Sequence, residues 1–193
     1  MSDQKQRDYI LFIEDDPYIR DDLTFFLENE FPELECKAMT GVTEFISHLD
    51  KLMTHPPIAV ILDIMMMIGD AGVKFPDIAY TELDGGLICL QLLQQHNSTA
   101  QVPVIVVSAK SLSVMKSKLD SFPQVVSYIE KPMDEKALSR IIDIVRSVLA
   151  IIGKPYRKKQ GTAKKLWSAI EAKPGVFGFR LDIRKLLKRK GRS

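Results

Sequence analysis

Short apolar runs alternate with amphipathic segments over about the first three quarters of the chain. The apolar runs are Tyr9–Ile13, residues 34–39, Ile58–Leu62, Val102–Val107 and Val125–Ile129, and residues 34–39 are the weakest of them. Runs of this length that end at polar residues, glycine or proline favour strands buried on both faces. The pattern therefore predicts five strands in the core.

Between and after these runs, apolar residues recur every three or four positions, which is the spacing of helices with one buried face. The predicted helices cover residues 17–27, 42–52, 87–93, 112–120 and 134–152. Pro17 suits a first helical turn, and Asp134 can cap the last helix. A strand–helix unit repeated five times predicts an α/β fold, a doubly wound five-stranded parallel sheet with helices on both faces and right-handed crossovers.

Two segments lack this alternation. Residues 68–82 contain scattered glycine and proline without a period, which indicates an inserted loop. Residues 154–165 read as a basic linker, and the remainder to residue 193 has the pattern of a short basic amphipathic segment. We therefore divide the chain into a domain of residues 1–153 and an extension of residues 154–193.

The formal net charge of +2 hides a strong asymmetry between these two parts. Residues 1–153 carry 13 Lys and Arg against 23 Asp and Glu, whereas residues 154–193 carry 14 against 2. Such an extension can contact its own acidic domain or a partner protein, bind nucleic acid, lie on an anionic membrane, or stay disordered. Charge alone does not separate these alternatives.

The sequence carries no export or membrane signal. Residues 1–8 are polar, and the longest apolar stretch, Ile141–Ile152, contains two charged residues and is too short to cross a bilayer. Cys36 and Cys89 lack metal-binding spacing and suit a reducing compartment. We therefore expect a cytoplasmic protein.

Polar residues with related chemistry follow four of the predicted strands. They are Glu14, Asp15, Asp63, Ser108 and Lys131. Ligands of open parallel sheets bind outside the carboxyl ends of the strands, so these side chains are expected to share one crevice. Singly, each is an ordinary strand-end or helix-start residue, and only their joint occurrence points to a site.

The residue types fit phosphoryl chemistry. Clustered carboxylates repel one another unless a cation intervenes, and Mg²⁺ prefers hard oxygen ligands. An aspartate beside that ion can act as a nucleophile on phosphorus. An ammonium and a hydroxyl, from Lys131 and Ser108, can then stabilise the charge on the transferred group.

Several motifs resemble the receiver domain of two-component response regulators over residues 8–152. They are Ile10–Pro17, Val60–Met66, Asp84–Gly85, Val104–Ala109 and Tyr128–Pro132. The resemblance implies the flavodoxin-like strand order 2-1-3-4-5. It also implies a phosphoacceptor at Asp63, magnesium ligands at Glu14, Asp15, Asp63 and the Met65 backbone carbonyl, switch residues at Ser108 and Tyr128, and a phosphate contact from Lys131 before a cis proline.

The sequence departs from the family pattern beside the predicted site. Met67 stands where the family usually has proline, and Asp84–Gly85 arrives some fourteen residues late. The intervening loop is either a tolerated surface insertion or a lid or docking surface for a kinase. Apolar Met65 stands where many members have a residue that orients water, and Lys110 is the other position that could face water. We therefore expect a long-lived phosphoryl state.

The resemblance implies a phosphorylation-dependent response regulator, not an enzyme with a separate substrate. A histidine kinase or phosphotransfer protein would donate the phosphoryl group, an unknown downstream protein would receive the signal, and phosphorylation could produce a homodimer. A different class of function stays open: a phosphorylation-independent binding module that acts through the basic extension. A phosphate-ester hydrolase is a weaker third alternative.

Overall fold

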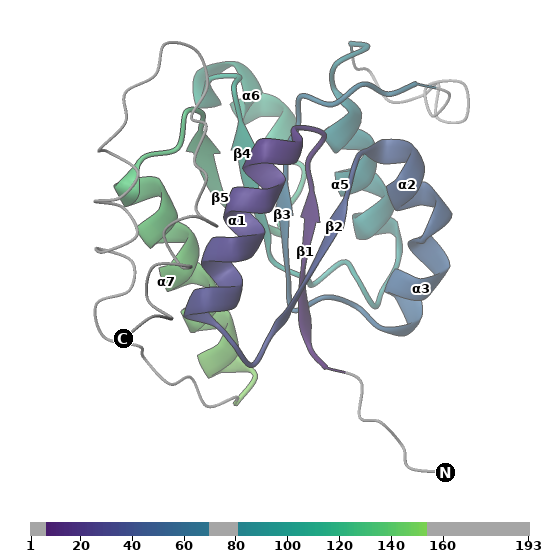
Figure 1. The fold of residues 1–193 in the computed structure, drawn as a ribbon. Coiled ribbons are helices and arrows are strands. Elements are labelled where there is room, and N and C mark those ends of the chain that lie inside the picture. Colours follow the sequence, from purple (N-terminus) through teal and green to yellow (C-terminus); the bar gives the residue numbers. More distant parts are fainter. Residues whose placement is uncertain (1–6, 70–80, 154–193) are drawn as a thin grey trace. The chain divides into compact units, whose positions relative to one another are not determined.

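The predicted strands form one parallel sheet in a computed structural model that describes residues 7–69 and 81–153 (Figure 1). The strands are β1 (Tyr9–Ile13), β2 (Glu35–Met39), β3 (Ala59–Leu62), β4 (Val104–Ser108) and β5 (Val125–Glu130). Their order is β2-β1-β3-β4-β5, and every neighbouring pair is parallel. This confirms the fold class and strand order expected from the sequence. Most of the inserted loop and all of the basic extension lie outside the described residues.

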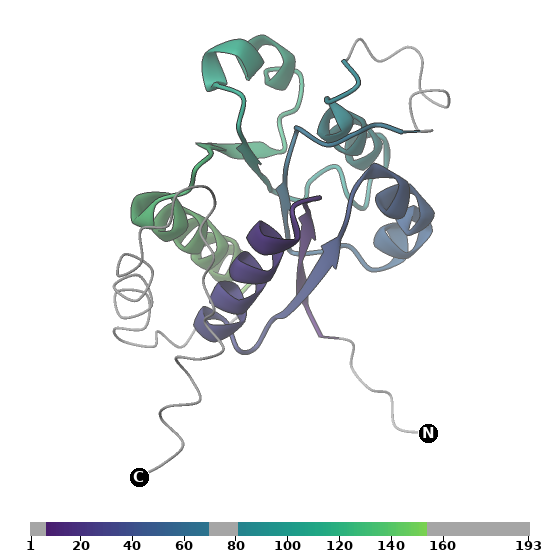
Figure 2. The same cartoon turned by 45° about the horizontal axis from the view of Figure 1, so that its top comes forward.

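Six helices in the described part of the chain cover the two faces of the sheet. They are α1 (Pro17–Glu30), α2 (Val42–Ser47), α3 (Leu49–Thr54), α5 (Gly85–Gln95), α6 (Leu112–Leu119) and α7 (Glu135–Ile151). Helices α1 and α7 lie side by side on one face, and the others lie on the opposite face (Figures 1 and 2). An ion pair of 2.5 Å between Glu30 of α1 and Arg146 of α7 joins the first two.

Two aspartates cap helices as their side-chain chemistry allows. Asp134 Oδ1 accepts a hydrogen bond from the Ala137 amide at 2.8 Å, which confirms the predicted cap of α7. Asp16 Oδ1 accepts from the Tyr18 amide at 2.8 Å, and Pro17 opens α1. The direction in which the chain leaves β1 is thereby fixed at the point where the predicted site begins.

The segment predicted as a single helix over residues 42–52 is two short helices that meet at His48. The prediction of one helix was wrong, and at the interruption two polar side chains bond the same helical carbonyl oxygen. The Ser47 hydroxyl donates to the Glu44 carbonyl oxygen at 2.7 Å, and the His48 ring nitrogen Nδ1 lies 3.0 Å from the same oxygen. The interruption turns His48 away from a regular helical position.

Paired glycines bring α5 against the segment that follows β3. The amide of Gly85 donates to the Met66 carbonyl oxygen at 3.0 Å, and that of Gly86 donates to the Ile64 carbonyl oxygen at 3.1 Å. A Cβ on Gly86 would overlap the Asp63 carbonyl oxygen, and one on Gly85 would lie 2.7 Å from the Met66 oxygen. Only glycine permits this close approach.

Candidate functional site

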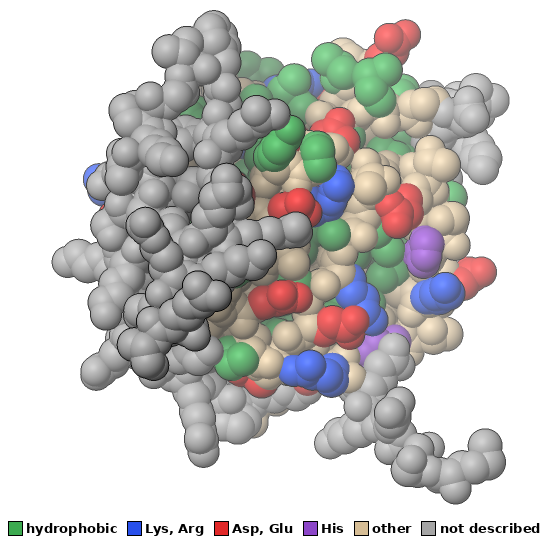
Figure 3. Space-filling view, in the orientation of Figure 1, with side chains coloured by type: hydrophobic (Ala, Val, Ile, Leu, Met, Phe, Trp, Pro, Cys, Tyr) green, Lys and Arg blue, Asp and Glu red, His purple; other side chains and the backbone are tan. Residues whose placement is uncertain are grey.

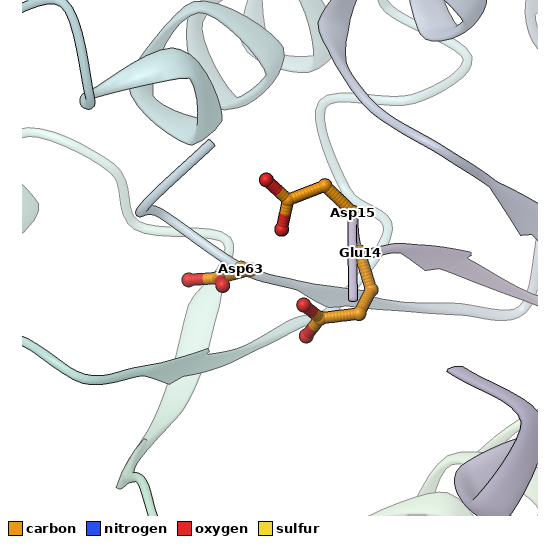
Figure 4. A group of neighbouring side chains, drawn as sticks. All are labelled: Glu14, Asp15 and Asp63. Atoms are coloured by element: carbon orange, nitrogen blue, oxygen red, sulfur yellow. The ribbon is translucent and has the colours of Figure 1, made fainter. Parts of the chain in front are cut away.

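Three carboxylates meet at the carboxyl ends of two neighbouring strands. Glu14 and Asp15 follow β1, and Asp63 follows β3, whose last residue pairs with the last residue of β1. One oxygen from each carboxylate lies within 4.8 Å of the others. Figure 4 shows the three side chains pointing into the same space. The predicted clustering of these residues is therefore confirmed.

The ammonium of Lys131 bridges two of these carboxylates from the end of β5. Its Nζ donates to Asp63 Oδ2 at 2.7 Å and to Glu14 Oε2 at 2.8 Å. The Lys131–Pro132 peptide bond is cis, as the family resemblance implies. Lys131 lies 117 positions from Glu14 and 68 positions from Asp63 in the chain, yet the three residues form one ion-paired group.

Burial gives this group unusual electrostatics. Glu14 and Asp63 are buried, whereas Asp15 is exposed. Burial raises the pKa of Glu14 to about 7, and the hydrogen bond from Lys131 only partly opposes the rise. Burial by itself lowers the pKa of Lys131, but its bonds to Asp63 and Glu14 outweigh burial and hold that pKa above the ordinary value. Lys131 therefore stays charged.

Both oxygens of Asp63 have hydrogen-bond donors. Oδ2 accepts from Lys131, and Oδ1 accepts from the backbone amide of Met65 at 2.7 Å. These two bonds hold the plane of the carboxylate in place before any ligand arrives. The amide of Met65 thus contacts the site directly, while the implied metal contact of its carbonyl oxygen stays a prediction.

The donor set fits Mg²⁺. Three carboxylates share one ammonium within the described ranges, so the group keeps an excess of negative charge. All three offer hard oxygen ligands, and Mg²⁺ binds through a few carboxylates together with phosphate oxygens and water. The exposed position of Asp15 leaves the group accessible to solvent.

The predicted switch residues lie on the adjacent strands. Ser108 ends β4 and is fully buried, and Tyr128 on β5 is partly buried. The Tyr128 hydroxyl donates to the Lys110 carbonyl oxygen at 2.7 Å. Burial raises the pKa of Tyr128, and a hydrogen bond with Ser108 opposes that rise. Tyr128 therefore holds the β4–α6 connection.

A second buried carboxylate, Asp84, belongs to a motif of the family resemblance but was not predicted as a site residue. Its side chain is fully buried at the start of α5 and forms ion pairs with Lys110 and, at 2.9 Å, with Lys118. It also accepts from the Thr81 amide at 3.0 Å. Lys110, expected as a position that could face water, instead contacts Asp84. No pattern in the sequence predicts that Lys118 pairs with Asp84.

The inserted loop is closed at its base by a backbone bond. The Ile68 amide donates to the Glu82 carbonyl oxygen at 3.0 Å, and a local turn follows in which the Asp84 amide donates to the Thr81 carbonyl oxygen at 2.9 Å. The segments that leave β3 and enter α5 are thus tied together within a few residues of Asp63. The predictions that the loop is a lid, a docking surface or a tolerated insertion concern residues that lie outside the described ranges.

No family model and no curated protein match the chain. Among solved structures, it is similar to a signal receiver domain of a DNA-binding response regulator from Colwellia psychrerythraea 34H. That match has 25% identity and a TM-score of 0.55, and it covers 72% of this chain and 98% of the other. The chemotaxis protein CheY4 of Vibrio cholerae matches with 13% identity and a TM-score of 0.55, over 75% of this chain and 100% of its own.

A third similar structure is the receiver domain of a sensor histidine kinase from Pseudomonas aeruginosa PAO1, which has a magnesium ion coordinated in its active-site cleft. It is 15% identical and has a TM-score of 0.51, and the match covers 72% of this chain and 97% of the other.

In the described ranges of the present chain, no helix is long and apolar enough to cross a membrane.

Proposed function

We propose that Asp63 accepts a phosphoryl group and that the domain, which is similar to a receiver domain of a response regulator, is a phosphorylation-dependent switch. The observation that carries this proposal is the bridge from Lys131 to Asp63 and Glu14 beside Asp15. It unites a nucleophile, an acidic ligand set and a phosphate-binding cation in one group. Each element is required for transfer to a carboxylate.

In the proposed reaction, a carboxylate oxygen of Asp63 forms a bond to phosphorus. The bond from phosphorus to the donor nitrogen of a phosphohistidine breaks, and its electron pair leaves with the imidazole. Lys131 is already within hydrogen-bond distance of Asp63, so its ammonium can contact the transferred oxygens without a large movement. The buried hydroxyl of Ser108 is the second donor proposed for these oxygens.

The residues that would hold Mg²⁺ are Glu14, Asp15 and Asp63, with the Met65 carbonyl oxygen as a fourth ligand. A bound Mg²⁺ would neutralise the carboxylates and the phosphoryl oxygens. Glu14 and Asp63 are held by Lys131, and Asp15 faces solvent, so the chain presents a partly prepared ligand set.

The proposed signal passes from Asp63 to the surface through Ser108 and Tyr128. Movement of Ser108 toward the phosphoryl group would change its influence on Tyr128, and Tyr128 holds the Lys110 carbonyl oxygen. The face formed by α6, β5 and α7 would then repack, a local change of charge read by a two-state element.

The proposed partners are a histidine kinase or phosphotransfer protein as donor and an unidentified protein as target. Homodimer formation on phosphorylation, a cytoplasmic location and contacts of the basic extension stay predictions. The proposal assigns the domain no separate substrate, so we do not class it as an enzyme.

Beryllofluoride, a mimic of the phosphoryl group, provides the test. With Mg²⁺ present, it is expected to change the NMR signals of Ser108 and Tyr128 in the wild type and in Asp120→Ala, a variant of an exposed carboxylate. Asp63→Ala should give no change. A response that persists in Asp63→Ala, or is absent from the wild type, would refute the proposal and favour the phosphorylation-independent binding module.

A further inference from the structure

A pocket lies among β1, β2 and the α2–α3 junction and shares no residue with the phosphoacceptor site. Its volume is about 330 Å³. Two lysines and two histidines line it, Lys37, Lys51, His48 and His55, and no carboxylate does. Figure 3 shows basic and histidine side chains near one another over α2 and α3. This is unexpected in a domain whose residues 1–153 carry 23 acidic against 13 basic side chains.

The floor of this basic pocket is apolar and firmly packed. Tyr9, Met39 and Leu52 are buried there. The Tyr9 ring lies 5.3 Å from the His55 ring, and its hydroxyl donates to the His55 carbonyl oxygen at 2.6 Å. Lys37 Nζ lies 4.1 Å from the centre of the same ring, a cation–π contact. The floor is therefore built from three elements of the fold.

Each histidine of the basic pocket has one ring nitrogen engaged by a backbone carbonyl oxygen. His48 Nδ1 lies 3.0 Å from the Glu44 oxygen, and His55 Nε2 lies 3.3 Å from the Arg7 oxygen. A carbonyl oxygen only accepts, so these nitrogens carry the hydrogen in both bonds. The second nitrogen of each ring forms no hydrogen bond within residues 7–69 and 81–153.

Packing explains the positions of only two of the four basic residues that line the pocket. Lys37 and His55 both contact the Tyr9 ring and help to hold β1, β2 and α3 together, and Lys37 Nζ also lies 3.6 Å from Glu35 Oε2. Lys51 is exposed and forms no ion pair with the described residues, and His48 occupies the break between two helices. A helix interrupted at a residue that lines a pocket is a local departure of the kind expected at functional positions.

We propose that this basic pocket binds a small phosphate monoester. Two ammonium groups offer donors from β2 and α3, and each imidazole can donate its second nitrogen to a phosphate oxygen in the imidazolium form, which suits the several oxygens of a phosphate group. Leu52 and Met39 would contact the carbon part of the ligand. The volume is at the lower end of the range of about 300–1,000 Å³ for small-molecule sites, so the ligand is smaller than a dinucleotide.

The test uses the full-length chain with Asp63→Asn and without Mg²⁺, so that the phosphoacceptor site does not contribute. Glycerol 3-phosphate, inorganic phosphate and glycerol are titrated at constant ionic strength, and binding is followed by residue-resolved NMR. Residue resolution is needed because the extension carries 14 basic residues of its own. Glycerol 3-phosphate should shift the signals of Lys37, His48 and Lys51 saturably, and glycerol should not.

Charge removal gives the matched comparison. Lys51→Met should weaken binding about tenfold, whereas Lys116→Met, a change at another exposed helical lysine, should leave the affinity unchanged. Lys51 is exposed, so its loss should leave the fold intact, and unchanged thermal unfolding checks this. Shifts confined to residues 154–193, or equal affinity in Lys51→Met, would overturn the site. Equally tight binding of inorganic phosphate would overturn the role of the apolar floor.

Discussion

Asp63 and Asp84 are both buried aspartates bonded to lysines, yet the balance of charge around them is opposite. Near Asp63, three carboxylates share one ammonium, that of Lys131, in the described part of the chain. Asp84 by itself pairs with two, those of Lys110 and Lys118. One group keeps excess negative charge, and the other is more than neutralised.

The pKa values follow this difference. Burial raises the pKa of Glu14 to about 7 despite its bond to Lys131. Burial would also raise the pKa of Asp84, but the bonds from Lys110 and Lys118 outweigh it and hold that pKa well below the ordinary range. A buried carboxylate is therefore not by itself a mark of function. In the proposed function, the unneutralised group receives the cation and the phosphoryl group, while Asp84 ties α5 to the β4–α6 connection.

Exchanging each aspartate for asparagine should separate the two roles most strongly. Asp63→Asn should abolish phosphorylation by a small phosphodonor, because the nucleophilic oxygen is lost. Asp84→Asn should still be phosphorylated but should lose about 2 kcal/mol of unfolding free energy, because a buried charged hydrogen-bonding group loses its ion pairs. Mass spectrometry and urea denaturation measure the two effects. Phosphorylation lost in a folded Asp84→Asn protein would contradict the comparison.

Replacing one lysine from each group is the next test. Lys131→Met should slow phosphoryl transfer by about a hundredfold, the usual effect of losing one donor to a developing charge. It should also tighten Mg²⁺ binding, because no ammonium then competes for Asp63 and Glu14. Lys110→Met should change the rate of phosphoryl transfer and the Mg²⁺ affinity much less than Lys131→Met does. Weaker Mg²⁺ binding in Lys131→Met, measured by calorimetry, would show that charge balance does not control the site.

The Asp63 group could be predicted from the sequence because its members directly follow strands or end them. In a parallel sheet, strand ends share one edge, so Glu14, Asp15, Asp63, Ser108 and Lys131 are placed near one another once the strands are recognised. The cis bond at Pro132 and the strand order came from the family resemblance. Those expectations were confirmed.

The Asp84 group could not be predicted in the same way. Asp84 follows a loop without periodic pattern, and Lys118 lies 34 residues away on the polar side of a short helix. Such a pairing depends on how α5 and α6 pack, which no local pattern encodes. The break at His48 escaped prediction because the apolar spacing stays regular across it, while the side chains of Ser47 and His48 both bond the Glu44 carbonyl oxygen.

In the metal-free protein, Glu14 and Asp84 should make the unfolding free energy depend on pH in opposite directions. Glu14 has a pKa of 4.5 when unperturbed and about 7 when folded, so the folded state holds a proton that the unfolded state releases. The stability from Glu14 is thus complete below pH 4.5 and is lost as the pH rises to about 7. Asp84 acts in the opposite direction: its stability is present above its unperturbed pKa of 3.8 and is lost as the pH falls below it.

Glu14→Gln should therefore flatten the fall in unfolding free energy between pH 4.5 and about 7, while Asp84→Asn should reduce the loss in acid. Urea denaturation over a pH series gives both slopes. An unchanged slope in Glu14→Gln would show that the burial of Glu14 does not destabilise the metal-free fold.

The smallest expected effect concerns water at the phosphorylated site. Met65 and Lys110 were the two positions expected to face it, but the ammonium of Lys110 is bound to Asp84, which leaves Met65 as the position to alter. Met65→Asn should speed dephosphorylation by up to about tenfold, less than the hundredfold or more of a fully positioned general base. Lys110→Asn should change the rate less, because its side chain is directed to the other charge group. Equal acceleration by both variants, measured as loss of the phosphoryl group over time, would mean that the bond to Asp84 does not keep Lys110 from the site.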